Sequence, residues 1–101
     1  MAKGYWIARI DVDDLDEYRR YVAANAEPLA AYGARFLARG GAFHAVEGQS
    51  RSRNVVIEFP SLQAALDCYH SPAYQAAIAL RTPVSRGEVV IVEGYDGPQP
   101  A

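Results

Sequence analysis

The sequence contains two histidines, whose ordinary pKa near neutral pH suits proton transfer. His44 follows Phe43 in a stretch expected to be a strand, where it is a candidate general base. The alternative is a histidine held by hydrogen bonds at a subunit interface. His70 follows Tyr69 on a predicted helix and is expected to point toward solvent. The two histidines lie in different elements and do not form the i, i+4 pair typical of a metal site, so no metal is expected.

Charged side chains on the predicted strands form a second group of candidates. Arg9 and Glu58 fall on two strands expected at the centre of the sheet, on one face, where they could meet as a cross-strand pair. Arg39 and Glu47 flank a glycine pair, and Arg53 lies near Glu47 if the hairpin has a simple register. One interpretation is a pocket for an anionic or carbonyl-bearing small molecule, with Arg39 and Glu58 as candidate catalytic residues and Arg9 as a ligand contact. The other is a set of salt bridges that fixes strand register and dimer orientation.

Tyrosines recur on the predicted helices, at Tyr18, Tyr21, Tyr69 and Tyr74. If their rings aim at the sheet, Tyr18, Tyr69 and Tyr74 are candidate ligand contacts. The alternative is that they pack in the core, which is the usual place for aromatic residues at helical spacing. Cys68 has no neighbouring base or cation in the sequence, and we expect it to be a small packing residue and not a nucleophile.

Several other kinds of site are not expected. The glycines form no dinucleotide or phosphate loop. The net charge is −2 and the longest basic patch is Arg51–Arg53, too few cations for nucleic-acid binding. One cysteine excludes an intrachain disulfide, and the aliphatic run Val89–Val92 is too short to span a bilayer. The first residues lack the apolar core of a signal peptide. We therefore expect a cytoplasmic protein with no cofactor, nucleic acid or membrane as its partner.

Hydrophobic periodicity places the candidate residues on four strands and two helical regions. Asp14 and Glu17 form a capping-box pattern at the start of the first helix, and Pro28 is expected to kink or break it. Ser61 is expected to cap the second helix, which Pro72 interrupts. The expected strands are 5–12, 35–47 with a bend at the glycine pair 40–41, 53–59 and 88–93; the expected helical regions are 15–32 and 62–81.

The element order β-α-β-β-α-β is typical of a ferredoxin-like α+β fold. Right-handed crossovers place the first and third strands at the centre of a four-stranded antiparallel sheet, with both helices on one face. All 101 residues then form a single domain, with a flexible tail from about residue 95. The opposite face keeps Ile7, Val56 and valines of the last strand, and we expect a second copy of the chain to cover this apolar surface in a homodimer.

Three stretches of the sequence carry a resemblance to a known family: residues 32–41 (YGARFLARGG), 46–48 (VEG) and 58–61 (EFPS), the last continued by Ala65, Tyr69, Ser71, Tyr74 and Arg81. The chain resembles the family catalogued as domain of unknown function 1330, with Ala34 where a second glycine is usual. The resemblance covers nearly the whole chain and implies a dimeric α+β barrel, in which two four-stranded sheets pack face to face. That superfamily includes cofactor-free monooxygenases, isomerases and haem enzymes, with a cleft between helix and strand as the usual site. The resemblance implies an architecture and does not name a single activity.

Two kinds of function stay open on the sequence. The first is a small cofactor-independent oxygenase, isomerase or lyase that acts on an aromatic or other carbonyl compound, with Arg39, His44 and Glu58 supplying polar groups. The second is a non-catalytic small-molecule-binding or interaction module, because no sharp catalytic constellation is present. A closed apolar cleft with convergent polar groups would favour the enzyme, and a cleft filled by Tyr and Leu side chains would favour the module.

Overall fold

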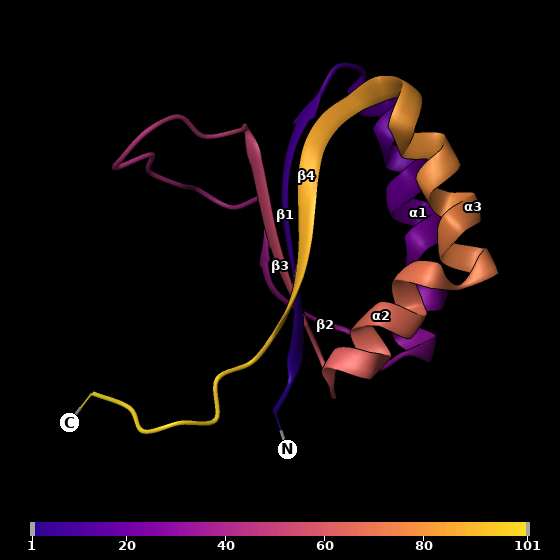
Figure 1. The fold of residues 1–101 in the computed structure, drawn as a ribbon. Helices are drawn as coiled ribbons and strands as arrows, with labels where there is room; N and C mark the ends of the chain where they lie inside the picture. Colours follow the sequence, from indigo (N-terminus) through magenta and orange to yellow (C-terminus); the bar gives the residue numbers. More distant parts are fainter. Residues whose placement is uncertain (1, 101) are drawn as a thin grey trace.

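The computed structural model describes residues 2–100, which fold into one antiparallel sheet with helices on one of its faces (Figure 1). The sheet order is β2-β3-β1-β4, so the first and third strands are central, as predicted. Every neighbouring pair of strands is antiparallel. This is the ferredoxin-like α+β fold. The strands are β1 (Gly4–Val12), β2 (Arg35–Arg39), β3 (Arg53–Phe59) and β4 (Ser85–Glu93).

Local sequence signals account for the helix boundaries. Asp14 caps α1 (Leu15–Ala31), because its carboxylate accepts a hydrogen bond from the backbone N–H of Glu17 at 3.2 Å. Helix α1 continues through Pro28 and does not end there. Ser61 caps α2 (Leu62–His70) and Ser71 caps α3 (Pro72–Arg81), which confirms the interruption predicted at this point. A short 3₁₀ turn (Thr82–Val84) then leads into β4.

The core lies between the helices and the face of the sheet that carries Trp6, Ile57 and Phe59. Trp6 is 2% exposed, and its indole N–H donates a hydrogen bond to the Ala65 carbonyl at 2.9 Å. Cys68 is fully buried in the same core, and burial raises the pKa of its thiol to about 11. A thiol in this state is a poor nucleophile, which agrees with the packing role expected of it.

The second strand is shorter than the sequence predicts. It ends at Arg39, and the prediction that it resumes over residues 42–47 is wrong. Gly40 has a φ of 67°, in the left-handed region that favours glycine, and there the chain leaves the sheet. Residues 40–52, called the arm from here on, extend to the side of the sheet opposite the helices (Figure 1). The irregularity in the ladder lies between Phe36 and Ala38, not at the glycine pair.

The face of the sheet opposite the helices is called the open face. It carries exposed apolar side chains at Ile7, Val90 and Val92, which are 40%, 56% and 41% exposed. Ile7 and Val90 lie opposite one another in the β1–β4 ladder, so these side chains are contiguous. The expectation of an uncovered apolar face in a single chain is therefore confirmed.

Candidate functional site

A cleft lies between the sheet and the pair of helices α1 and α3, and it holds a cavity of about 30 Å³. That volume has room for a few water molecules with the side chains as they lie. The walls combine aromatic and aliphatic side chains with several polar groups. The cleft is lined by Trp6, Ala8, Ile10, Tyr18, Tyr21, Val22, Asn25, Phe36, Arg39, Arg53, Val55, Ile57, Tyr74, Arg81 and Val89.

Two tyrosine hydroxyls meet in the buried wall of the cleft. The oxygens of Tyr21 on α1 and Tyr74 on α3 are 2.6 Å apart and share a hydrogen bond. Burial, together with the neighbouring Tyr21, raises the pKa of Tyr74, so its hydroxyl stays protonated. In such a pair one hydroxyl donates to the other, and the accepting hydroxyl keeps a proton of its own to donate. The pair therefore offers one hydrogen-bond donor to a ligand.

Asn25 adds an amide to the lining of the same cleft. It follows Tyr21 by one helical turn on α1 and is 5% exposed. Its Oδ1 atom is buried and has no hydrogen-bond partner among residues 2–100. A buried acceptor without a partner is costly, and most native structures avoid it. This atom marks the cleft as a place where a bound molecule would complete the hydrogen bonding.

Three arginines reach the cleft from three different elements. The guanidinium carbon of Arg53, at the start of β3, lies 5.5 Å from the centre of the Tyr18 ring. That of Arg81, at the end of α3, lies 5.2 Å from the Tyr21 ring. The guanidinium of Arg39 stacks 4.0 Å from the Phe36 ring at the exposed edge. Stacking on aromatic faces holds guanidinium groups in place without a carboxylate.

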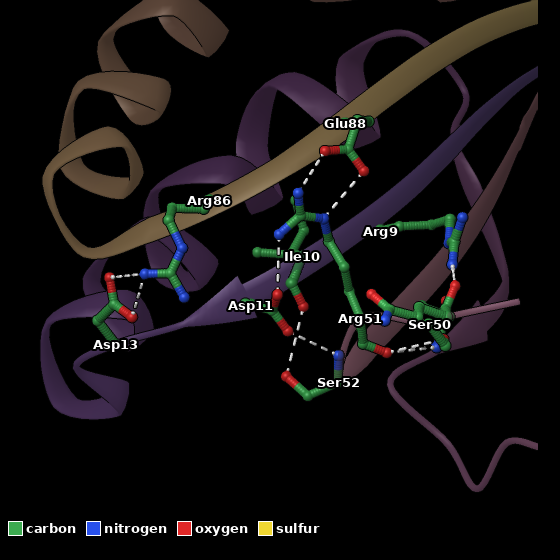
Figure 2. Close-up of polar contacts among 11 residues, drawn as sticks. Arg9, Ile10, Asp11, Asp13, Ser50, Arg51, Ser52, Arg86 and Glu88 are labelled. Atoms are coloured by element: carbon green, nitrogen blue, oxygen red, sulfur yellow. Dashed lines mark hydrogen bonds and ion pairs between the residues drawn. The ribbon is translucent and has the colours of Figure 1, made fainter. Parts of the chain in front are cut away.

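A second polar site lies on the open face at the base of the arm (Figure 2). Arg51 donates to Asp11 at 2.8 Å and to Glu88 at 2.9 Å and 2.5 Å. The backbone N–H of Ser52 donates to Asp11 at 2.9 Å, and Arg9 donates to the Gln49 carbonyl at 3.0 Å. Positive and negative side chains balance in this cluster, and Arg51 ties the arm to β1 and β4. Its geometry fits a structural clamp.

The clamp predicts an acid dependence of stability. The Ser52 N–H and Arg51 hold the pKa of Asp11 below its usual value, and Arg51 does the same for Glu88. A carboxylate with a lowered folded pKa adds stability above its unfolded pKa of about 4, and this contribution is lost as pH falls. We therefore expect Asp11→Asn to lower the urea midpoint near neutral pH, and expect the difference from wild type to shrink below about pH 4.

The control for this measurement is Asp16→Asn, which breaks an ion pair on the exposed surface of α1, where Asp16 is 90% exposed. Exposed pairs of this kind contribute about 0–1 kcal/mol, so the control is expected to show little change at any pH. An Asp11→Asn effect of the same size at acidic and at neutral pH would contradict the clamp.

The structure separates the candidate residues taken from the sequence. Tyr18, Tyr74 and Arg39 line the cleft. Tyr69 lies outside its lining and packs edge-on against Trp6 with ring centres 5.9 Å apart. His44 and Glu47 lie on the exposed arm and not on a strand, so the expected strand position of His44 is wrong. His70 is exposed at the end of α2, as expected.

The expected pairing of Arg9 with Glu58 is also wrong. Both residues are on the open face, but the ladder places Arg9 opposite Asn54 and Glu58 opposite Tyr5. Glu58 instead accepts a hydrogen bond from the Tyr5 hydroxyl at 3.0 Å. Neither residue lines the cleft.

Sequence reasoning missed the cleft positions of Asn25, Arg53 and Arg81. A signal for two of them was available in the helical spacing. Asn25 follows Tyr18 by seven residues and Arg81 follows Tyr74 by seven, so each polar residue continues a buried aromatic stripe. A polar residue that continues a buried aromatic stripe indicates a position in the lining of a site.

The part of the chain that the structure describes contains no group of three or more His, Cys, Asp or Glu side chains placed to hold a metal ion. None of its helices combines the length and the apolar composition needed to cross a bilayer.

Solved structures with the same fold include proteins of unknown function and an oxygenase. A protein of unknown function from Rhodopseudomonas palustris has a TM-score of 0.75 at 12% identity, over 95% of this chain and 85% of that one. The cofactor-independent oxygenase SnoaB from Streptomyces nogalater has a TM-score of 0.64 at 14% identity, over 99% and 97%. A dimeric ferredoxin-like protein of unknown function from Thermobifida fusca has a TM-score of 0.59 at 19% identity, over 91% and 89%. Likeness at this level of identity establishes the fold.

No curated protein matches the sequence. Residues 3–95 match the family described as a domain of unknown function, DUF1330, which is the family that the sequence resembles. The match spans both central strands, all three helices and every residue that lines the cleft. The chain therefore belongs to the DUF1330 family.

Proposed function

We propose that this protein is a small cofactor-independent enzyme that binds an enolisable carbonyl compound in the cleft and stabilises its enolate. The observation that carries the proposal is that one cleft contains both the buried Tyr21–Tyr74 hydroxyl pair and the Asn25 Oδ1 atom, which has no partner among residues 2–100. All three residues line the same cavity, and a few polar groups among aromatic and aliphatic walls are typical of a site for a ligand.

The chemistry follows from the groups that converge. A hydroxyl donor and a nearby guanidinium stabilise negative charge that develops on a carbonyl oxygen, as an oxyanion hole does. The hydroxyl pair supplies the donor, and Arg81 lies over the Tyr21 ring beside it. In the described residues no histidine or carboxylate lines the cleft to accept a proton. The proposal therefore favours substrates whose C–H bond is already acidic and loses its proton to water.

The fold of the neighbours supports an enzyme of this kind. SnoaB is described as a cofactor-independent oxygenase, and its structure covers 99% of this chain. An enolate is an electron-rich carbanion equivalent, and reaction with dioxygen or reprotonation at another atom are its two ordinary outcomes. The cleft residues would serve the common first step of both, which is formation of the enolate.

The test follows exchange of the benzylic protons of 1-phenyl-2-propanone and of phenylpyruvate for deuterium in D₂O, by proton NMR. Wild-type protein is expected to accelerate exchange of at least one of them. Tyr74→Phe, which removes one hydroxyl, is expected to reduce the accelerated rate about 100-fold. The matched control is Tyr95→Phe, the same change on a tyrosine that is 68% exposed. Absence of acceleration with both compounds would overturn the proposed enzyme.

A non-catalytic binding module is the second candidate, and the cavity size favours it. A volume of about 30 Å³ admits little more than water until side chains move. Arg39 is exposed at the edge and stacks only on Phe36, so it is the side chain that a larger ligand would displace. Binding of either compound without exchange would support the module.

We also propose that the protein is a homodimer formed through the open face. Its support is the exposed apolar set Ile7, Val90 and Val92 and the dimeric neighbour from Thermobifida fusca. The arm leaves the sheet on the same side, so it would contact the second copy (Figure 1). Standard interfaces bury about 1,600 Å² in total, and a four-stranded sheet face is large enough to supply its half.

A further inference from the structure

The cleft is electropositive within a chain whose net charge is −2. Its lining contains Arg39, Arg53 and Arg81 and no aspartate or glutamate. The chain as a whole has 12 acidic residues, so the missing carboxylates are not explained by composition. Cations gathered in a cleft with apolar walls concentrate a positive potential there.

Four of the six arginines outside the cleft have acidic partners. Arg19 and Arg20 bond to carboxylates one turn away on α1, and Arg51 and Arg86 bond to carboxylates of other segments. The three cleft arginines form no ion pair with any residue from 2 to 100. Arg9 and Arg35 also form no ion pair among residues 2–100, but Arg9 donates to the Gln49 carbonyl and Arg35 is exposed. The cleft differs because it gathers three unpaired arginines in one place.

Two of these guanidinium groups have donors that are sequestered from water. The Nε atoms of Arg53 and Arg81 are buried and have no hydrogen-bond partner within the described chain. A buried N–H of a charged group without an acceptor is costly, and the cost falls when an acceptor is bound. A guanidinium group binds a planar oxyanion through two parallel N–H donors, and the Nε–H group is one of these donors.

Gly40 makes room for one of these groups. A Cβ atom at this position would lie 2.5 Å from Nη1 of Arg53, so the guanidinium packs against bare backbone. The positive φ of Gly40 also excludes most other residues without strain. The turn where β2 ends thus holds Arg53 beside the cleft instead of in solvent.

We infer that the ligand of the cleft is an anion, a carboxylate carried on an aromatic or other apolar body, with Arg53 and Arg81 as its carboxylate contacts. This inference rests on the proposed function, which places the site in the cleft. It adds that the molecule bound there carries a negative charge. A carboxylate supplies the planar acceptors that the two Nε–H groups lack, and the aromatic walls cover the body.

The test compares phenylacetate with phenylacetamide, which has the same body and no charge, by isothermal titration calorimetry on the full chain. Wild-type protein is expected to bind phenylacetate at least about tenfold more tightly than phenylacetamide. Arg81→Gln and Arg53→Gln are each expected to weaken phenylacetate binding about ten- to a hundredfold and to leave the amide nearly unchanged. Arg19→Gln, on the exposed surface of α1, is the matched control and is expected to change neither affinity.

The comparison of the two ligands on wild-type protein needs no variant, so a variant that fails to fold does not remove the test. Equal affinity for acid and amide, or no binding of the acid, would overturn the inference. If the protein accelerates deuterium exchange of the neutral 1-phenyl-2-propanone but binds phenylacetate and phenylacetamide equally, the proposed enzyme stands and the inference of an anionic ligand fails. If the protein binds phenylacetate tightly but accelerates exchange of neither carbonyl compound, the inference of an anionic ligand is supported and the proposed enzymatic function is overturned.

Discussion

Substitution of Trp6 by alanine is expected to lower the free energy of unfolding by about 3–5 kcal/mol. Trp6 is 2% exposed and packs against Phe59, Tyr69 and Tyr74, with ring centres 4.9, 5.9 and 4.7 Å away. Alanine would leave a cavity between the sheet and two helices and would remove the hydrogen bond to Ala65. Since domains of this size have about 5–15 kcal/mol in total, the variant should be close to unfolding.

Urea denaturation followed by far-ultraviolet circular dichroism measures this effect, because the substitution removes the only tryptophan. Trp6→Phe keeps an aromatic ring and removes the hydrogen bond to Ala65, so it should cost clearly less than Trp6→Ala. Tyr95→Ala, a change of similar size at an exposed position, should cost almost nothing. An alanine variant with a wild-type midpoint would mean that the helices do not pack on this ring.

Substitution of Val90 by glutamate is expected to convert the protein from dimer to monomer. Val90 is 56% exposed in a single chain and lies on the edge strand β4, opposite Ile7 of the central strand β1 on the open face. A charge buried there without a partner would cost several kcal/mol for each copy, and symmetry places two such charges in one interface. This is the largest effect on assembly that we expect from a single substitution.

Sedimentation equilibrium at micromolar concentration distinguishes the states, because a single chain has a mass of 11.0 kDa and a dimer twice that. Leu15→Glu is a closely matched control, since Leu15 is 55% exposed and lies at the start of α1, away from the open face. Wild type and Leu15→Glu should sediment as dimers and Val90→Glu as a monomer. A monomeric wild type would disprove the dimer.

Strands β1 and β3 and the starts of the helices were predictable because their signals are local. The cap residues Asp14, Ser61 and Ser71 satisfy backbone groups within the next turn, so neighbours in the sequence decide them. Alternation along β1 and β3 assigns each side chain to a face, and Trp6 and Ile57 lie on the buried face as expected.

The register and the cleft depend on information that is not local. A shift of two or four residues between β1 and β3 keeps every side chain on its face, so alternation could not separate an Arg9–Glu58 pair from the observed Tyr5–Glu58 pair. The places of Arg53 and Arg81 follow from how α1 and α3 pack over the sheet. Helical spacing and strand alternation assign these two residues to the inner faces, but they do not predict where a long, flexible side chain will place its guanidinium group.

The end of β2 at Arg39 has a consequence for self-association along the sheet edge. An exposed edge strand presents free N–H and C=O groups on which another chain can add a strand. Here the edge strand has only five residues, is broken by an irregularity between Phe36 and Ala38, and has arginines at both ends. Short length, a distorted ladder and repelling charges all oppose addition of a further strand, so growth of the sheet into fibrils should be disfavoured at this edge.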